Sequence, residues 1–191
     1  MNMKNFNNVS EKIKQMREFN DLSIDGLAER SGLSPHLIEQ IEEKQAYPSL
    51  SPLIKIARAL GVRLGTFLDD EISTNCVVVK KDDKRKIVRF PSAETKVGDL
   101  NFESLGYNKK DRYMEPFLIT IDPREESDPL ISSHEGEEFL YVLEGQVVVT
   151  YGNETHLLGP GDSIYYDSVV PHNVRSNGET AKFVAVVYTP L

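Results

Sequence analysis

Three residues in the second half of the chain are of the types that hold a transition metal: His134, Glu138 and His172. His134 and Glu138 stand four positions apart at the start of an apolar, alternating run, and His172 follows Pro171 far along the chain. Two imidazoles and one carboxylate are the ligand set typical of non-haem iron, and manganese, nickel and zinc accept the same donors. The pattern predicts that the three side chains form the floor of one ligand or metal pocket.

Alternation along residues 138–143 explains why Glu138 needs partners. Successive strand residues point to opposite faces, so Glu138 shares a face with Leu140 and Val142. If that face lines a barrel, the carboxylate needs a cation, a hydrogen-bond partner, a proton or a wet pocket. The residues alone leave two interpretations open. His134 and His172 hold a metal together with Glu138, or they only hydrogen-bond it and close the pocket mouth.

The elements that position these residues are expected to be short β-strands. From residue 69 onward, short alternating runs are separated by Gly, Pro and Asn. Ten such runs with turn signals between them are typical of a β-sandwich or small barrel. The expected strands are residues 76–79, 86–90, 100–106, 113–121, 138–143, 146–151, 155–158, 163–166, 172–175 and 182–188.

Four tyrosines and the single cysteine of this half are interpreted as packing residues rather than ligands. The cysteine begins the apolar run Cys-Val-Val-Val, which indicates a packed thiol in a strand, and with no second cysteine it forms no internal disulfide. These residues are Tyr107, Tyr113, Tyr165, Tyr166 and Cys76.

Residues 10–68 have apolar side chains three or four positions apart, the period of an amphipathic helix. We expect five short helices around a shared small core, the last one near residues 64–68. Helix starts are indicated by Ser10, Ser23, Ser34 with Pro35, and Ser49, and helix ends by Gly32 and Gly61. The expected core comprises Ile13, Met16, Ile24, Leu27, Ala28, Leu37, Ile41, Leu53, Ile56, Ala57 and Leu60.

The charge of the chain is divided unevenly between its two parts. The 191 residues carry a net charge of −8, but residues 1–68 hold nine Lys/Arg against eight Asp/Glu, and residues 69–191 hold thirteen against twenty-two. Nonspecific coating of nucleic acid is therefore not expected. DNA binding by the first part would depend on the local placement of a few basic residues and on a second copy, so we expect a homodimer. The basic residues concerned are Lys12, Lys14, Arg17 and Lys44.

Cellular location follows from what the sequence lacks. No apolar run approaches the roughly 18 residues of a membrane span, and the N-terminal residues lack the apolar core of a secretory signal. We expect a cytoplasmic protein without membrane contact.

The motif from Leu22 to Glu42, two short helices around a Gly turn, resembles the lambda-repressor-like, XRE-type helix-turn-helix family over residues 10–68. In that family the third helix lies in the major groove of a double-stranded DNA operator. Gln40 is the best candidate for reading a base, because its amide pairs bidentately with adenine. The DNA-binding residues that the resemblance implies are Ser34, Pro35, His36, Gln40 and Lys44.

Two positions depart from the family pattern. Glu43 stands where a neutral or basic phosphate contact is usual, and Ile24 stands where the second helix commonly begins with a polar group. Both departures predict weak phosphate affinity. The alternative is a domain that only mediates dimerisation or other protein contacts.

Residues 86–191 resemble the cupin family. The first motif of that family has two histidines one residue apart, then a Glu, and a Gly seven residues after the Glu. Glu138 and Gly145 keep that spacing, whereas Ser132 replaces the first histidine of the motif. The turn at residues 159–162 and His172 match the second motif. The resemblance implies a jelly-roll barrel and a site for one divalent metal (Fe, Mn, Ni or Zn) with the ligands His134, Glu138 and His172, although sensor cupins also bind small molecules without metal.

Together the two resemblances imply a two-domain α + β protein, with an N-terminal all-α five-helix domain and a C-terminal all-β cupin domain. The expected boundaries are 1–68 for the helix-turn-helix domain, 69–85 for a linker and first β segment, and 86–191 for the cupin. This layout resembles bacterial one-component regulators that sense a small-molecule effector and have no catalytic residues. The alternative is a non-haem iron enzyme of the hydroxypropylphosphonate epoxidase type, which has the same layout.

Overall fold

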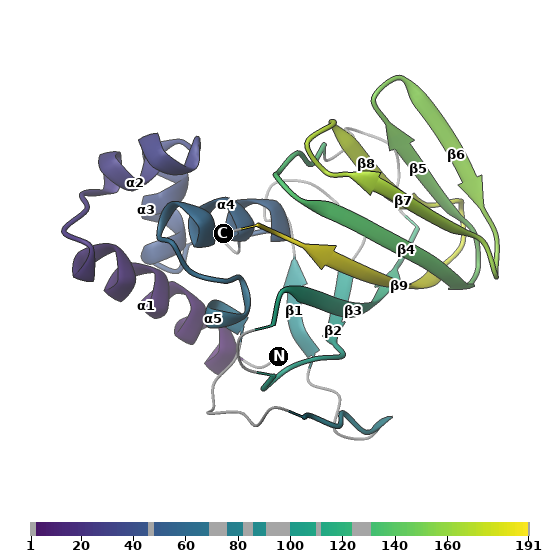
Figure 1. Cartoon of the computed structure of the whole chain (residues 1–191), viewed down its shortest axis with the longest axis horizontal. Helices are drawn as coiled ribbons and strands as arrows, with labels where there is room; N and C mark the ends of the chain where they lie inside the picture. The colour runs from purple at the N-terminus through teal and green to yellow at the C-terminus, as the bar shows by residue number, and fades with distance from the viewer. Residues whose placement is uncertain are drawn as a thin grey trace. The chain divides into compact units, whose positions relative to one another are not determined.

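The computed structural model describes residues 3–45, 48–68, 76–81, 86–90, 100–109, 112–123 and 131–190. The chain divides into two compact units, residues 1–72 and 73–190. The helices lie in the first unit and the strands in the second (Figure 1), which confirms the expected α + β class. Among the described residues, none of the helices has both the length and the apolar character that a membrane span requires.

Five helices form the described part of the first unit: α1 (Met3–Phe19), α2 (Ile24–Ser31), α3 (Pro35–Glu42), α4 (Leu50–Ala59) and α5 (Gly65–Leu68). The Ser23 hydroxyl accepts a hydrogen bond from the Gly26 N–H at the start of α2. The Ser34 hydroxyl accepts one from the Leu37 N–H at the start of α3. Gly32 ends α2 with a φ of 67°, a left-handed conformation that favours glycine.

Two details of the expected helices were wrong. Ser10 does not cap α1, because the helix begins at Met3 and Ser10 is fully buried within it. The seven residues before Ser10 contain neither Gly nor Pro, so nothing stops the helix from extending upstream. The core face of α3 is Ile38 with Ile41, three residues apart, whereas Leu37 is half-buried.

A buried ion pair joins α1 to α3. Arg17 donates two hydrogen bonds to the Glu42 carboxylate, Nε to Oε1 at 2.6 Å and Nη2 to Oε2 at 2.7 Å. Its Nη1 also donates to the Leu22 carbonyl at 2.8 Å. Side-chain exposures are 10% for Arg17 and 5% for Glu42. The expectation that Arg17 helps to contact DNA phosphate is therefore wrong, because its guanidinium is used to hold α3 in place.

The second unit consists of two antiparallel sheets. The strands are β1 (Lys86–Phe90), β2 (Leu100–Ser104), β3 (Met114–Ile121), β4 (Glu137–Glu144), β5 (Val147–Tyr151), β6 (Glu154–Leu158), β7 (Ser163–Asp167), β8 (His172–Ser176) and β9 (Ala181–Tyr188). Their order is β1-β2-β3-β9-β4-β7 in the six-stranded sheet and β6-β5-β8 in the three-stranded sheet. Alternate residues of β3, β4 and β9 are buried between the sheets, including Phe117, Leu140 and Phe183.

Nine of the ten expected strands are present, with shifts of one or two residues at their ends. Residues 76–79 are not a strand, and Cys76 is exposed rather than packed. An apolar run has strand propensity, but it becomes a strand only where a neighbouring strand pairs with it. The segment after this run, Lys-Lys-Asp-Asp-Lys-Arg-Lys at residues 80–86, is rich in basic residues, and its residues 82–85 lie outside the described part of the chain.

The Arg17–Glu42 pair predicts a large stability effect. We expect Arg17→Met to lower the free energy of unfolding by about 3 kcal/mol, because it leaves a buried carboxylate without its cation. Lys44→Met is the control, since Lys44 forms an exposed pair with Glu11 at 2.6 Å and should cost less than about 1 kcal/mol. Urea unfolding of the two variants measures the difference, and equal costs would contradict the role given to Arg17.

Candidate functional site

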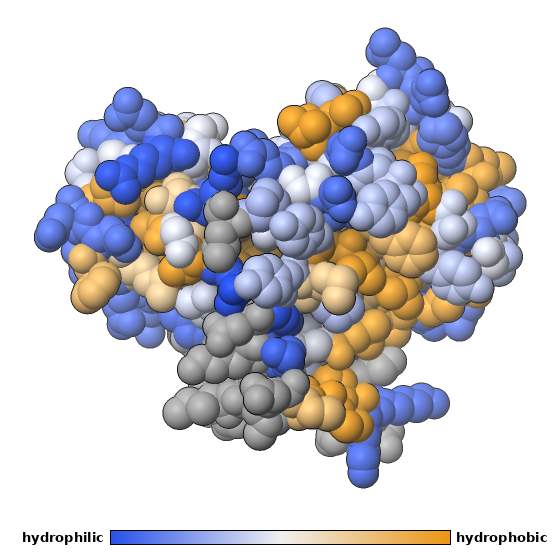
Figure 2. Space-filling view, viewed as in Figure 1, coloured by the Kyte–Doolittle hydropathy of each residue, from blue (hydrophilic) through white to orange (hydrophobic). Residues whose placement is uncertain are grey.

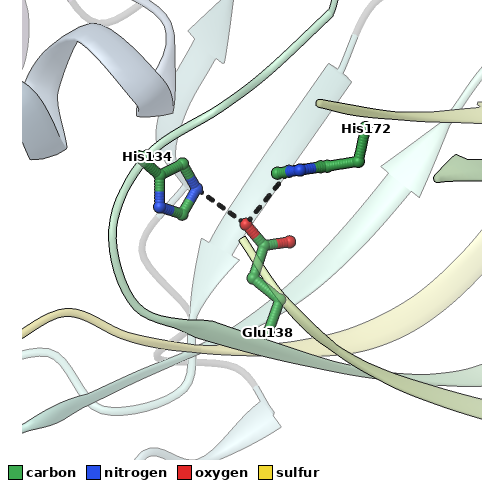
Figure 3. A group of neighbouring side chains, drawn as sticks. All are labelled: His134, Glu138 and His172. Atoms are coloured by element: carbon green, nitrogen blue, oxygen red, sulfur yellow. Dashed lines mark hydrogen bonds and ion pairs between the residues drawn. The ribbon is translucent and has the colours of Figure 1, made fainter. Parts of the chain in front are cut away.

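The structure brings His134, Glu138 and His172 together (Figure 3). Glu138 points inward from β4, His172 begins β8, and His134 lies in the loop before β4. The Oε1 atom of Glu138 lies 2.8 Å from Nε2 of His134 and 3.5 Å from Nε2 of His172. All three residues are buried, with 9% exposure or less. The inward face predicted for Glu138, Leu140 and Val142 is confirmed.

Backbone contacts position the loop that carries His134. Ser132 and His172 form a two-way backbone bridge, with N–O distances of 2.7 and 2.9 Å. The His134 N–H donates to the Ser168 carbonyl at 3.0 Å. Gly136 has a φ of 111°, and a Cβ atom there would overlap the Tyr188 carbonyl oxygen. The loop therefore requires glycine at this position, and Ser132 contributes its backbone rather than a ligand atom.

In each histidine, Nε2 faces Glu138 and Nδ1 points away from it. The hydrogen bond made by Nδ1 determines which ring nitrogen carries the proton and which carries the lone pair. Nδ1 of His134 lies 3.1 Å from the Glu135 carbonyl, and Nδ1 of His172 lies 2.9 Å from the Val170 carbonyl. A carbonyl oxygen only accepts, so each Nδ1 carries a proton. In a neutral imidazole Nε2 is then an acceptor, and it faces Oε1 of Glu138, another acceptor. This arrangement is stable only with protons or a cation among the three atoms.

The three donors fit a divalent metal. Their ligand atoms all lie within 4.8 Å of one another. Atoms that each lie about 2.1 Å from a shared metal are roughly 3 to 3.5 Å apart, and the two Nε2–Oε1 distances are close to this range. In metal-binding histidines, the ring nitrogen that does not bind the metal usually donates a hydrogen bond to a carbonyl or carboxylate, as both Nδ1 atoms do here. The donor set, its spacing and its support thus match the requirements of a metal centre.

The ionisation of Glu138 depends on its two histidine partners. Burial raises the pKa of Glu138, but hydrogen bonds from His134 and His172 and their positive charge outweigh burial and lower this pKa to about 2. For His172, burial lowers the pKa, and the hydrogen bonds to Glu138 and to the Val170 carbonyl outweigh burial, so its pKa is raised. In the absence of a metal, the two pKa shifts therefore favour the ionised carboxylate of Glu138 and the protonated imidazole of His172 more than in free side chains.

Tyr166 is a site residue that sequence reasoning missed. Its hydroxyl donates to Oε2 of Glu138 at 2.8 Å, and burial together with the negative charge of Glu138 raises the Tyr166 pKa, so the phenol stays protonated. The packing role expected for this residue was thus incomplete. Tyr113 and Tyr165, also expected to pack, are 62% and 65% exposed. Alternation requires one of Tyr165 and Tyr166 to point inward, but only the pairing of Tyr166 with Glu138 decides which one.

The residues predicted to bind DNA lie at the two ends and on the exposed side of α3. The Ser34 hydroxyl caps the helix, while Pro35 and His36 are exposed in its first turn. Gln40 follows His36 by one helical turn and is half-buried. Lys44 lies beyond the end of α3 and pairs with Glu11. Their contact with DNA stays a prediction.

Family comparisons agree with both units. Residues 10–71 match the family model described as a helix-turn-helix domain, and residues 117–187 match the model described as a cupin domain. The chain therefore contains a helix-turn-helix domain followed by a cupin domain.

Individual relatives match nearly the full length of the chain. The chain is 24% identical to the HTH-type transcriptional regulator PuuR of Escherichia coli, over 94% of this chain and 93% of the relative. It is 27% identical to the (S)-2-hydroxypropylphosphonic acid epoxidase of Streptomyces wedmorensis, over 93% of each. A crystal structure of an HTH_3 family transcriptional regulator from Vibrio cholerae superposes with a TM-score of 0.70 at 24% identity, covering 97% of both chains. This last similarity confirms the fold.

The Tyr166 hydrogen bond predicts a pH-dependent stability difference. In the metal-free protein, Tyr166→Phe should lower the free energy of unfolding at neutral pH by about 1–2 kcal/mol, because Oε2 of the buried carboxylate loses its donor. The folded pKa of Glu138 lies below its usual 4.5, so its stabilising contribution is present above that value and lost as the pH falls toward about 2. The variant raises the folded pKa, so the deficit should shrink below about pH 4. Urea unfolding at both pH values checks this, and a deficit independent of pH would contradict it.

Proposed function

We propose that this protein is a dimeric DNA-binding transcriptional regulator whose cupin domain binds a small-molecule effector. The observation that carries the proposal is a repressor-like third helix joined in one chain to a buried His134–Glu138–His172 pocket. Full-length similarity to a protein named as an HTH-type transcriptional regulator supports it. The regulator layout also accounts for the near-neutral charge of residues 1–68, since operator reading in this family depends on a few placed side chains.

The proposed mechanism is linkage between the two domains. An effector that binds one dimer geometry better than another changes the population of the two geometries. The spacing between the two recognition helices changes with them, so operator affinity changes by the same coupling free energy. In this account α3 reads DNA, and the Arg17–Glu42 pair keeps α3 fixed relative to α1.

The residues of the pocket have separate roles in this proposal. His134, Glu138 and His172 would hold one divalent metal, with Fe, Mn, Ni and Zn all compatible with the donors. When bound, the metal supplies a Lewis acid with open positions for an effector oxygen. The Val170 carbonyl fixes the His172 ring, and Tyr166 holds the second oxygen of the carboxylate by its hydrogen bond.

A second candidate function is a metal-dependent oxidation. It is favoured by the His-x-x-x-Glu and distant His pattern of this pocket and by the 27% identity to the epoxidase. Against it, the buried Arg112 guanidinium already pairs with the Glu115 carboxylate at 2.6 Å and donates to the Lys109 backbone carbonyl, so it is not placed to bind a phosphonate. We therefore place the regulator first.

DNA reading by α3 predicts a sequence-specific loss in one variant. Gln40→Ala should weaken binding to a near-palindromic operator by about 1–3 kcal/mol while leaving nonspecific binding unchanged, because an amide–adenine pair contributes discrimination of that size. Gln15→Ala is the matched control, since Gln15 is exposed on α1. Footprinting at low salt measures both. Absence of any protected site would contradict the DNA role, and equal protection by wild type and Gln40→Ala would contradict the assignment to Gln40.

Metal content tests the pocket separately. Protein purified without chelator or a metal-affinity tag should contain one metal per chain, and His134→Ala or His172→Ala should remove it with the fold intact. His156→Ala is the control, because His156 lies on β6 outside the cluster. Metal bound equally by wild type and His172→Ala would contradict a shared site. If wild type binds no metal, Glu138→Gln should still change the effector response.

Turnover separates the two candidate functions. A regulator should show a ligand-dependent shift in operator affinity without consuming oxygen. Substrate-dependent oxygen consumption by the iron-loaded protein that is lost in His172→Ala would favour the enzyme instead.

A further inference from the structure

The outward side of the six-stranded sheet is apolar where a solvated sheet would be polar. An antiparallel sheet with one face in water normally alternates between inward hydrophobic and outward polar residues. On β3, β4 and β9 the inward set is buried as expected, but most of the outward positions are hydrophobic as well. We define the outer face by Met114, Pro116 and Leu118 of β3, Val184, Val186 and Tyr188 of β9, Phe139, Tyr141 and Leu143 of β4, and Tyr165 of β7.

Strand register makes these side chains one continuous surface. Phe139 stands opposite Tyr165 on one side and Val186 on the other, and Val186 in turn stands opposite Pro116. The rings of Phe139 and Tyr165 are 6.4 Å apart. One level along, Tyr141 stands opposite Val184. Figure 2 shows hydrophobic residues gathered over β9 and β3, next to residues of paler colour.

The outer face has an exposed apolar centre and polar residues at its margin, as protein interfaces do. Tyr141 and Leu143 are each 41% exposed, and Tyr165 is 65% exposed. The polar outward residues lie at the margin, with Ser163 and Asp167 on the edge strand β7. An apolar centre with a polar rim is typical of protein interfaces rather than of solvated surfaces.

The outer face is large enough for a stable contact. Strands β3, β9 and β4, about 4.8 Å apart and each eight residues long, cover together with the five-residue β7 roughly 470 Å² before side-chain relief is counted. The largest apolar patch on a typical single chain is about 300–600 Å² and is often functional, so this face lies in the size range of a functional patch. A standard interface buries about 800 Å² of accessible surface on each partner, which this face approaches.

We propose that the outer face is the dimer interface and that a second copy of the same face occupies it. This rests on the proposed function, because two recognition helices on a near-palindromic site require two copies. Among the residues of the helical unit whose exposure is described, Phe19 is the only exposed large hydrophobic side chain, so those residues form no comparable surface. A flat face of antiparallel strands packs on itself by a two-fold rotation, and large apolar contacts are characteristic of permanent dimers.

Sedimentation equilibrium of the full chain without DNA tests this interface. Wild type should be a dimer at micromolar concentration, and Leu143→Arg or Tyr141→Arg should raise the dimer dissociation constant at least tenfold. Both side chains are exposed, so the fold should be kept, which circular dichroism checks. Leu157→Arg is the matched control, because Leu157 is 56% exposed on β6 of the other sheet and should leave the dimer unchanged.

Two outcomes would overturn the interface. One is a wild-type monomer across the concentration range. The other is a dimer that Leu143→Arg and Tyr141→Arg leave unchanged, as would occur if the helical unit or another protein covered the face. Because mass is measured without DNA, a dimer weakened by these variants supports the interface even if footprinting finds no operator, and the proposed function would then fail alone.

Discussion

The burial of one carboxylate, that of Glu138, is the constraint on which the cupin site depends. Alternation along β4 places this residue between the sheets with Leu140 and Val142, where an unpaired charge would be strongly destabilising. Three groups from separate parts of the chain meet that charge: His134 from the preceding loop, Tyr166 from β7 and His172 from β8. Two backbone features bring those groups together. They are the bridge between Ser132 and His172 and the glycine at position 136.

The same principle acts in the helical unit with a different result. Glu42 is buried at the end of α3, and Arg17 neutralises it with two hydrogen bonds while a third bond holds the Leu22 carbonyl. This ion pair needs no further partner for its charge, since each oxygen of the Glu42 carboxylate accepts a hydrogen bond from the Arg17 guanidinium. In the cupin pocket two Nε2 atoms face one oxygen, and a cation or protons must complete the set. The first pair therefore fixes a helix, whereas the second leaves two imidazole nitrogens directed at one carboxylate oxygen, where a cation could bind.

Local sequence patterns predicted much of both units. The features that they did not predict depend on contacts between residues far apart in the sequence. Caps at Ser23 and Ser34 and the inward face of β4 follow from neighbours within a few residues, so the sequence was sufficient. The burial of Arg17 depends on Glu42, 25 residues away, and the inward choice between Tyr165 and Tyr166 depends on register with β4. The meeting of His134, Glu138 and His172 was predicted because residue types and a motif resemblance supplied the long-range information that periodicity lacks.

Nitrogen NMR of the two imidazoles tests the central claim, that protonated Nδ1 atoms leave two Nε2 atoms directed at Glu138 for a cation. In metal-free protein the account predicts a proton on Nδ1 of both His134 and His172. On titration with a divalent metal, both Nε2 signals should shift together at one equivalent while Nδ1 stays protonated. An unprotonated Nδ1 with a protonated Nε2 in either ring, or no change in the Nε2 signals at saturating metal, would contradict it.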